Sequence, residues 1–194
     1  GIAHLIADAM VEDGITEDKA LSQISFFDSK GLVTKTRGDK LAAHKLDFAH
    51  DWKNTTDFAE AIRQIKPAAI IGVSATGGAF TEEVVKAMTE INAQPIIMAL
   101  SNPTSKSECT AKQAYEWSEG KCLFACGSPF DPVTVAGKTF VPRQGNNSYV
   151  FPGIGFGCIF ARAKTIPNQV FLTASKALAD LVSEGDLANG SLYP

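Results

Sequence analysis

The sequence predicts an α/β fold built on a doubly wound parallel sheet. Short apolar runs alternate with segments of helical period along the 194 residues. The runs are apolar on both faces, which is typical of strands that are buried in a parallel sheet. Strand, helix and strand therefore follow one another with short loops, as in α/β proteins. Right-handed crossover connections join such strands and place the helices against the sheet.

Four apolar runs are the expected strands. They are residues 24–27, 68–73, 95–100 and 122–125. Polar residues, glycine or proline follow each run, and these residue types end strands. Because parallel strands end at the same edge of a sheet, where ligands bind in open α/β folds, the turns after these runs are the places to look for a site.

The expected helices have apolar side chains at helical spacing and recognisable first residues. They are residues 2–10, a short helix after Thr16, a helix opened by Asp57, a helix after Thr81, a helix between Thr110 and Gly120, an apolar helix near residues 152–163, and a last helix from about Asn168 to Glu184 that Gly185 stops. Glu82 and Glu83 suit the positive first turn of a helix that Thr81 caps. Thr110 and Gln113 match a capping box.

The first residues predict that the chain is a fragment of a longer polypeptide. Helical periodicity begins at residue 2, yet neither a capping side chain nor an initiator methionine precedes it. We therefore expect the native N-terminus to lie elsewhere, so that this sequence cannot show a targeting segment.

Composition and charge exclude several classes of function. Apolar residues make up 45% of the chain and charged residues 20%, which excludes a disordered chain, a collagen-like repeat and a coiled coil. The 18 basic and 21 acidic residues give a net charge of −3, so we expect no nucleic-acid partner. The longest apolar runs are strand-sized, well short of the roughly 20 residues that cross a bilayer, so we expect no membrane association.

The cysteines predict scattered structural thiols rather than a metal or redox cluster. Cys122 and Cys126 are four positions apart instead of forming a C-x-x-C pair, and Cys109 and Cys158 lie farther away. Reduced thiols fit a reducing compartment. We therefore expect a cytoplasmic protein, with an organellar matrix as the alternative.

The first candidate site is the turn that follows residues 24–27. Asp28 is placed to accept a hydrogen bond from the ribose of a dinucleotide. Ser29, Lys30 and the downstream Lys45 are placed to neutralise a 2′-phosphate. The alternative is a plain turn after a strand, where Asp and Gly are common.

Three further turns carry polar or small residues. The glycine-rich residues 72–80 form either a wall that a cofactor approaches or a flexible turn, because they match no Walker or G-x-G-x-x-G motif. Pro103 disfavours helical geometry at Asn102, whose amide then donates and accepts toward a ligand or forms an Asx turn. The amides in residues 144–148 suit a carboxylate or a carboxamide, with turn formation as the alternative.

Familiar hydrolytic motifs are absent from the sequence. Residues 1–194 contain no G-x-S-x-G elbow and no H-E-x-x-H helix. His4, His44 and His50 lie in segments that read as solvated helix or loop. We therefore expect them to be surface residues rather than general bases.

Six motifs, taken in order, resemble the malic enzymes. They are Phe27-Asp28-Ser29-Lys30-Gly31-Leu32, Ile71-Gly72-Val73, Gly77-Gly78-Ala79-Phe80-Thr81, Ala99-Leu100-Ser101-Asn102-Pro103-Thr104, Gly127-Ser128-Pro129-Phe130 and Gly145-Asn146-Asn147-Ser148-Tyr149. Each motif is unspecific alone, but the ordered set spans nearly the whole chain. Arg143, where the family usually has Gly, and Cys126, commonly Ser, depart from the pattern.

The resemblance implies a Rossmann-type fold that lacks its first strand and glycine-rich turn. It implies one NAD(P)-binding domain over residues 1–194, with a helical C-terminal extension from about residue 150. The implied reaction is the oxidative decarboxylation of L-malate to pyruvate and CO₂ with reduction of NADP or NAD. The implied Mg²⁺ or Mn²⁺ ligands and the proton-transferring residues belong to upstream stretches, so no catalytic residue is expected in this fragment.

The resemblance also implies the roles of individual residues. Asn102, Asn146 and Asn147 would touch malate and the nicotinamide end, with Asn102 shared between substrate and cofactor. The adenosine side and the cofactor wall would be formed by Asp28, Ser29, Lys30, Lys45, Val73 and Ser74. Ser29, Lys30 and Lys45 resemble the NADP-preferring members. The family generally assembles as homodimers or homotetramers.

Two other functions stay open at this point. One is a malolactic-type relative that holds NAD tightly and releases lactate. The other is a catalytically silent module that binds a dinucleotide or serves assembly, which the absence of metal ligands favours.

Overall fold

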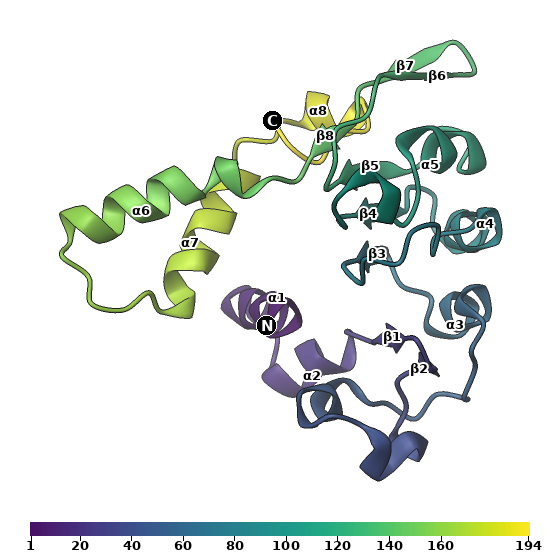
Figure 1. Cartoon of the computed structure of the whole chain (residues 1–194), viewed down its shortest axis with the longest axis horizontal. Coiled ribbons are helices and arrows are strands. Elements are labelled where there is room, and N and C mark those ends of the chain that lie inside the picture. The colour runs from purple at the N-terminus through teal and green to yellow at the C-terminus, as the bar shows by residue number, and fades with distance from the viewer. The chain divides into compact units, whose positions relative to one another are not determined.

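The computed structural model describes residues 1–194, except for the side chain of Asp39. The chain forms two compact units, whose elements are labelled in Figure 1. Unit 1 comprises Gly1–Ile65 with Ile166–Leu172, and unit 2 comprises Lys66–Thr165 with Thr173–Pro194.

A parallel four-stranded sheet forms the centre of unit 2. Its strands are β3 (Ala69–Gly72), β4 (Ile96–Ala99), β5 (Leu123–Cys126) and β8 (Arg143–Gln144), adjacent in the order β3-β4-β5-β8. Ala69 pairs with Ile96, and Ile96 pairs with Leu123, so the first three strands are in register. Every residue of β5 is buried, as expected for a strand that is apolar on both faces. Three of the four predicted strands are confirmed, and with them the α/β fold class.

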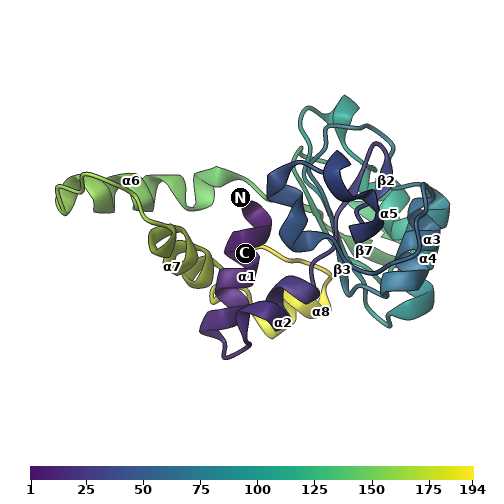
Figure 2. The same ribbon diagram turned by 90° about the horizontal axis from the view of Figure 1, so that it is seen from below.

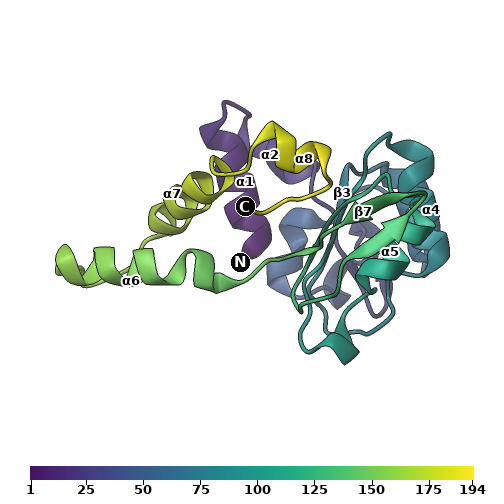
Figure 3. The ribbon, with the colours of Figure 1, turned by 90° about the horizontal axis from the view of Figure 1, so that it is seen from above.

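Two helices of unit 2 cover the same side of this sheet. They are α4 (Glu82–Ile91) and α5 (Ala111–Trp117), and Figure 3 shows both against one side of the strands. The Thr81 hydroxyl accepts a hydrogen bond from the Val84 N–H, and Thr110 and Gln113 form both bonds of a capping box. Both predicted helix starts are therefore confirmed.

The core of unit 2 contains aromatic and aliphatic side chains from the sheet and helices. Tyr115 is fully buried and stacks on Phe140 with ring centroids 4.6 Å apart, and it meets the edge of Phe124 at 5.6 Å. Val85 and Met88 on α4 are also fully buried. Burial of these large side chains is the main stabilising term for the sheet and its helices.

Phe140 belongs to a hairpin that the sequence did not predict. Strands β6 (Val133–Val135) and β7 (Lys138–Phe140) pair antiparallel around Ala136 and Gly137, which both have positive φ. Figure 1 shows this hairpin next to α5. The strands are only three residues long, too short for a periodic pattern to be recognised.

Helix α6 (Phe151–Phe160) is apolar on all sides, as predicted, but has no buried residue. Phe151, Phe156, Ile159 and Phe160 are 70–83% exposed. Figure 2 shows α6 extending away from the sheet of unit 2. No helix in the described part of the chain is both long and apolar enough to cross a lipid bilayer.

Unit 1 consists of short elements around a small aromatic core. Its elements are α1 (Ile2–Glu12), α2 (Glu17–Ser22), β1 (Phe27–Asp28), β2 (Gly31–Leu32), the 3₁₀ helices η1 (Lys35–Lys40) and η2 (Ala43–Phe48), and α3 (Phe58–Ile65). Phe48 is fully buried and stacks on Phe26 at 4.4 Å, while His4 meets its edge at 5.0 Å. The Asp57 carboxylate caps α3 by accepting from the Glu60 N–H.

Residues 24–27 do not form a parallel strand, which corrects the prediction. Phe27 and Asp28 instead pair antiparallel with Gly31 and Leu32 in a two-residue hairpin. The Lys30 N–H donates to Asp28 Oδ1 at 2.9 Å, and Gly31 has a φ of 100° that only glycine adopts readily. This tight turn reverses the chain directly after Asp28.

The predicted last helix is two helices. Helix α7 (Asn168–Ala179) ends early, and α8 (Glu184–Ala188) follows. Ser183 is extended and forms a capping box with Asp186, so a new helix starts there. Gly185 therefore lies inside α8 rather than ending α7, because a local cap outweighs the continuing apolar pattern.

Candidate functional site

The carboxyl ends of the unit 2 strands lie at one edge of the sheet. The loops that leave this edge begin at residues 73, 100, 127 and 145. They include Val73, Ser74, Asn102, Asn146 and Asn147, all of which the sequence singled out. In open α/β folds this edge is where ligands bind.

The loop after β3 has a strained tip that a side chain holds in place. Ala75 has a φ of 54°, a left-handed conformation that costs a residue with a Cβ about 1 kcal/mol or more. Its N–H donates to the Ser101 Oγ at 2.9 Å. Val73 and Ser74 are exposed on this loop, so both are accessible to a ligand.

The amide of Asn102 is oriented by a neighbouring loop. Ser128 Oγ donates to Asn102 Oδ1 at 2.7 Å, and the Asn102–Pro103 peptide bond is cis. Within the described residues, the Asn102 Nδ2 has no hydrogen-bond partner. An amide held in this way presents its donor end to a ligand carboxylate or carboxamide.

A glycine allows these two loops to pack closely. A Cβ at Gly127 would lie 2.2 Å from the Leu100 carbonyl oxygen and 3.1 Å from Asn102 Nδ2. No side chain is therefore tolerated at residue 127 without movement of the Asn102 loop.

The amides at the end of β8 and after it have two kinds of surroundings. Gln144 Nε2 donates to the Gly127 carbonyl at 2.8 Å, and Asn146 Oδ1 accepts from the Ser148 N–H at 2.9 Å. These two side chains stabilise loops, which is the turn role that the sequence left open. Asn147 is exposed on the 3₁₀ helix η4 (Asn147–Tyr149). Because β5 separates β8 from β4, strand spacing puts their ends about 10 Å apart.

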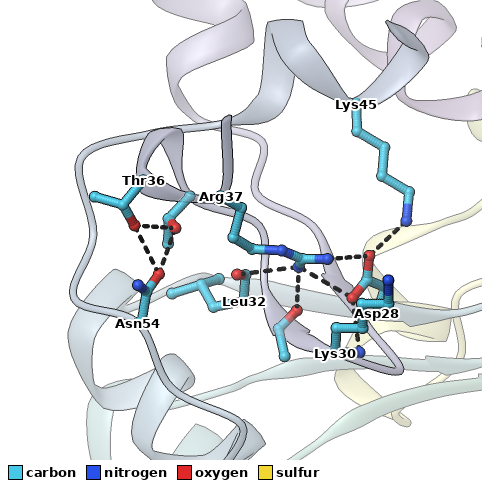
Figure 4. A network of polar contacts seen from close by, with 9 residues as sticks. Asp28, Lys30, Leu32, Thr36, Arg37, Lys45 and Asn54 are labelled. Atoms are coloured by element: carbon cyan, nitrogen blue, oxygen red, sulfur yellow. Dashed lines mark hydrogen bonds and ion pairs between the residues drawn. The ribbon is translucent and has the colours of Figure 1, made fainter. Parts of the chain in front are cut away.

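Asp28 is the centre of an ion-pair network in unit 1. Arg37 Nη1 donates to Asp28 Oδ1 at 3.0 Å, and Arg37 Nη2 donates to Oδ2 at 3.1 Å. Lys45 Nζ donates to Oδ2 at 2.5 Å. Figure 4 shows Arg37 and Lys45 reaching the same carboxylate from different segments. The three side chains are only 14–25% exposed.

These bonds keep Asp28 ionised. Desolvation by burial raises the pKa of this carboxyl group, but the hydrogen bonds from Arg37, Lys45 and the Lys30 N–H lower it by more. The net result is a pKa well below its usual range. Asp28 is therefore a permanent acceptor, as a ribose hydroxyl donor requires.

A cavity of about 180 Å³ opens beside this carboxylate. It is lined by Asp28, Ser29, Lys30, Arg37, Lys40, Leu41, Ala42 and Lys45. Four basic side chains thus face one carboxylate that Arg37 already neutralises. The cavity has a net positive charge and a serine hydroxyl, which together suit a phosphate group.

Arg37 also fastens the hairpin to the following segment. Its Nη1 donates to the carbonyl oxygens of Gly31 at 3.1 Å and Leu32 at 3.3 Å. Beside it, Asn54 Oδ1 accepts from Thr34 Oγ1 at 2.5 Å and from Thr36 Oγ1 at 2.9 Å (Figure 4). The hydrogen bonds of Arg37 and Asn54 therefore join the segments that carry the side chains of the cavity.

Five residues that shape these sites had no role assigned to them from the sequence. They are Arg37, Lys40, Ser101, Glu108 and Ser128. Arg37 and Lys40 belong to a 3₁₀ segment without a periodic signal, and Glu108 resembles an ordinary acidic residue near a helix start. Its neighbours Ser107 and Cys109 are buried in the structure, but nothing in the sequence indicated this.

The described side chains do not form a metal site. No three His, Cys, Asp or Glu residues among them are grouped so as to hold a metal ion. No step through a metal is therefore assigned to these residues. His4 and His50 are both half-buried. His4 lies 3.2 Å from Asp47, and a ring nitrogen of His50 lies 2.7 Å from the Ile24 carbonyl oxygen.

Comparisons with known proteins identify relatives over the full length of the chain. An NADP-dependent malic enzyme of Anas platyrhynchos is 50% identical over 195 residues, and the protein of the same name from Homo sapiens is 47% identical. One from Dictyostelium discoideum is 44% identical over 196 residues. Each match covers 100% of this chain but 34–36% of the relative.

The chain thus spans about a third of the length of these relatives. A family model described as the malic enzyme NAD-binding domain matches residues 1–194. The match covers both units and every motif at the sheet edge and around Asp28. The chain belongs to the malic enzyme NAD-binding domain family.

Proposed function

We propose that this chain is the dinucleotide-binding part of a malic enzyme that uses NADP. The enzyme would convert L-malate and NADP⁺ into pyruvate, CO₂ and NADPH. The observation that carries the coenzyme choice is the cavity at Asp28, where Lys30, Arg37, Lys40 and Lys45 face a single carboxylate.

The Asp28 network explains how one site accepts both a ribose and its phosphate. Asp28 stays ionised and accepts a hydrogen bond from a ribose hydroxyl, while the guanidinium group of Arg37 neutralises the carboxylate charge. Lys45 has three ammonium hydrogens, so it can keep its bond to Asp28 and donate to a 2′-phosphate. Ser29 and Lys30 line the same cavity.

The sheet edge of unit 2 would bind the reacting end. Bound NADP would accept a hydride from C2 of malate. Asn102, with its amide oriented by Ser128, would donate to the substrate or to the nicotinamide carboxamide. The exposed side chain of Asn147 would contact the same groups, and Asn146 would shape the turn beside it. Val73 and Ser74 would line the cofactor wall.

The rest of the proposal concerns the protein as a whole. We infer that residues 1–194 serve as one NAD(P)-binding domain with a helical extension from about residue 150. We also infer a homodimer or homotetramer, which the exposed apolar side chains of α6 support because monomers seldom expose such surfaces. Sedimentation of the full-length enzyme tests the assembly.

Four cysteines without disulfides support a reducing compartment, the cytoplasm in this proposal.

Calorimetric titration of the chain with NADP and with NAD tests the coenzyme site. We expect NADP to bind about tenfold or more tightly than NAD, because several charge-assisted bonds form only with the phosphate. Addition of 2′,5′-ADP, which carries the same phosphate, should compete with NADP. Equal affinity for NADP and NAD would contradict the coenzyme assignment.

Turnover is tested in a full-length malic enzyme that contains this chain. We expect malate-dependent NADPH formation with Mn²⁺, and a loss of about tenfold or more in turnover for Asn147→Ala. Lactate without net NADPH would indicate the malolactic alternative. Tight dinucleotide binding without turnover would indicate a binding module, and undiminished turnover of the variant would remove Asn147 from the site.

A further inference from the structure

Glu108 is a buried carboxylate that the proposed reaction does not use. It is 1% exposed and precedes the capping residue of α5 by two positions. Its Oε1 accepts from the Ser101 Oγ at 2.5 Å, and its Oε2 accepts from the Ser101 N–H at 3.3 Å. The described residues offer Glu108 no ion pair. A carboxylate buried in this way is costly, so a purely structural position would favour an apolar residue.

Ser101 links Glu108 to the loop after β3. The same Oγ that donates to Glu108 accepts from the Ala75 N–H at 2.9 Å. Because a hydroxyl has one hydrogen, the bond to Glu108 fixes its direction and leaves a lone pair for Ala75. Glu108, Ser101 and Ala75 therefore form a directed chain of hydrogen bonds, which we call the Glu108 relay.

The relay ends on a residue that needs support. Ala75 adopts a φ of 54°, and residues in such conformations persist where their surroundings hold them, often at ligand sites. The base of the loop is fixed by backbone bonds from Gly78 to Ser107 and from Phe80 to Glu108. The Ala75 bond fixes the tip, next to the exposed Val73 and Ser74.

The Glu108 segment packs closely against the end of β3 and the loop that follows it. A Cβ at Gly72 would lie 2.4 Å from the Glu108 Cδ, and a Cβ at Gly77 would lie 2.6 Å from the Ser105 carbonyl oxygen. Gly72, the last residue of β3, and Gly77 in the loop must therefore lack side chains for Glu108 and its segment to fit. Both glycines lie in residues 72–80, for which the sequence predicts either a wall that a cofactor approaches or a flexible turn.

We propose that Glu108 is a positioning residue for the cofactor-facing loop. Through Ser101 it holds Ala75 in its left-handed conformation, and with it Val73 and Ser74 in the shape that meets the dinucleotide. The relay belongs to unit 2, whereas the cavity proposed to select the 2′-phosphate belongs to unit 1. This inference rests on the proposed function for what the loop binds, but not for the relay itself.

Hydrogen exchange of the 194-residue chain without nucleotide tests the relay directly. We expect Ser101→Ala and Glu108→Ala to speed exchange of the amides in residues 74–77 about tenfold, because Ala75 loses its acceptor or the acceptor loses its orientation. Glu108→Gln should lie between these variants and the parent, since its amide oxygen still accepts from Ser101. Ser107→Ala is the matched control, because its buried hydroxyl donates to the Cys109 carbonyl at 2.8 Å and touches no loop amide.

Dinucleotide titration of the same variants tests what the loop does. We expect Ser101→Ala to weaken NADP and NAD by the same factor, about fivefold, because the loop would meet the part that the two coenzymes share. The ratio of the two affinities should stay as in the parent, and Ser107→Ala should bind like the parent. If Glu108→Ala fails to fold, the more conservative variant Ser101→Ala still tests the role of the loop.

The outcomes separate the two proposals. If the amides of residues 74–77 exchange at the same rate in Ser101→Ala as in Ser107→Ala, the relay is overturned. Faster exchange with unchanged dinucleotide affinity overturns its positioning role. A parent chain that binds neither NADP nor NAD overturns the proposed function, while the exchange result still decides whether the relay exists.

Discussion

Arg37 holds both carboxylate oxygens of Asp28, with Nη1–Oδ1 at 3.0 Å and Nη2–Oδ2 at 3.1 Å. This two-pronged contact joins a 3₁₀ segment to the turn of a two-residue hairpin. It neutralises Asp28 and at the same time keeps it ionised. A positive cavity can therefore include an acidic residue at its centre without repelling a phosphate.

Lys45→Gln should lower the affinity for NADP about tenfold and change the affinity for NAD less than twofold. The ammonium group lies in the cavity and would lose its attraction to the 2′-phosphate, which NAD lacks. Calorimetric titration with both coenzymes measures the two effects. Lys35→Gln is the control, since Lys35 pairs with Asp51 at 2.7 Å outside the cavity lining. Equal losses for both coenzymes in Lys45→Gln would remove the selective role of Lys45.

Arg37→Met should lower the free energy of unfolding by about 2 kcal/mol. The variant leaves the half-buried Asp28 carboxylate and two carbonyl oxygens with fewer donors. Urea unfolding at pH 7 measures the loss. Lys35→Met removes an ion pair whose side chains are 61% and 76% exposed, so it should cost less than about 0.5 kcal/mol. Similar losses in the two variants would show that burial does not strengthen the Arg37 contact.

The stability that Asp28 contributes should disappear in acid. Because its folded pKa lies well below the ordinary value of 3.8, the unfolded chain takes up the proton first as the pH falls. The contribution is therefore complete well above the unfolded pKa and is lost progressively below about pH 5. The difference in unfolding free energy between the parent and Asp28→Asn should be largest at pH 7 and shrink toward pH 3. A difference that grows on acidification would have the wrong sign for this network.

Cys158 should be the one thiol that reacts readily in the folded chain. Cys109, Cys122 and Cys126 are buried, and burial raises the pKa of Cys122 and of Cys126 to about 11. At pH 8 these groups are protonated and inaccessible, so they are poor nucleophiles. Titration with a chromogenic disulfide should report one thiol in the native chain, none in Cys158→Ser, and four after denaturation of the parent. Rapid reaction of a second native thiol would contradict the buried placement.

The sequence anticipated the parallel sheet well because its signals are local. Residues 68–73, 95–100 and 122–125 are apolar on both faces. Strands β3 and β4 lie within the first two runs, and β5 overlaps the third and ends one residue after it. Thr81 and Thr110 cap helices through bonds three residues away, which a sequence pattern contains in full. Asp28 was found because it follows an apolar run directly, and Asn102 because it lies two residues after one.

The sites were anticipated only in part, because their remaining members come from elsewhere in the chain. Residues 24–27 have the composition of a strand, but their pairing partner is set by the turn at Lys30 and Gly31. Arg37 reaches Asp28 across nine positions of irregular backbone, a distance at which no periodicity applies. The Asn146 side chain holds its own turn, which the residue type alone left undecided.

By itself the sequence determined the approximate positions of β3, β4 and β5 and the starts of α4 and α5. It also determined which residues follow these strands and which family the chain resembles. These properties depend on side-chain spacing and on bonds between near neighbours. The sequence did not predict β8. The tertiary structure alone decided that Arg37 and Lys45 share the Asp28 carboxylate and that Glu108 is buried beneath Gly72. Such contacts join segments that are far apart along the chain, so no sequence pattern predicts them. They form because buried polar groups need hydrogen-bond partners within the fold.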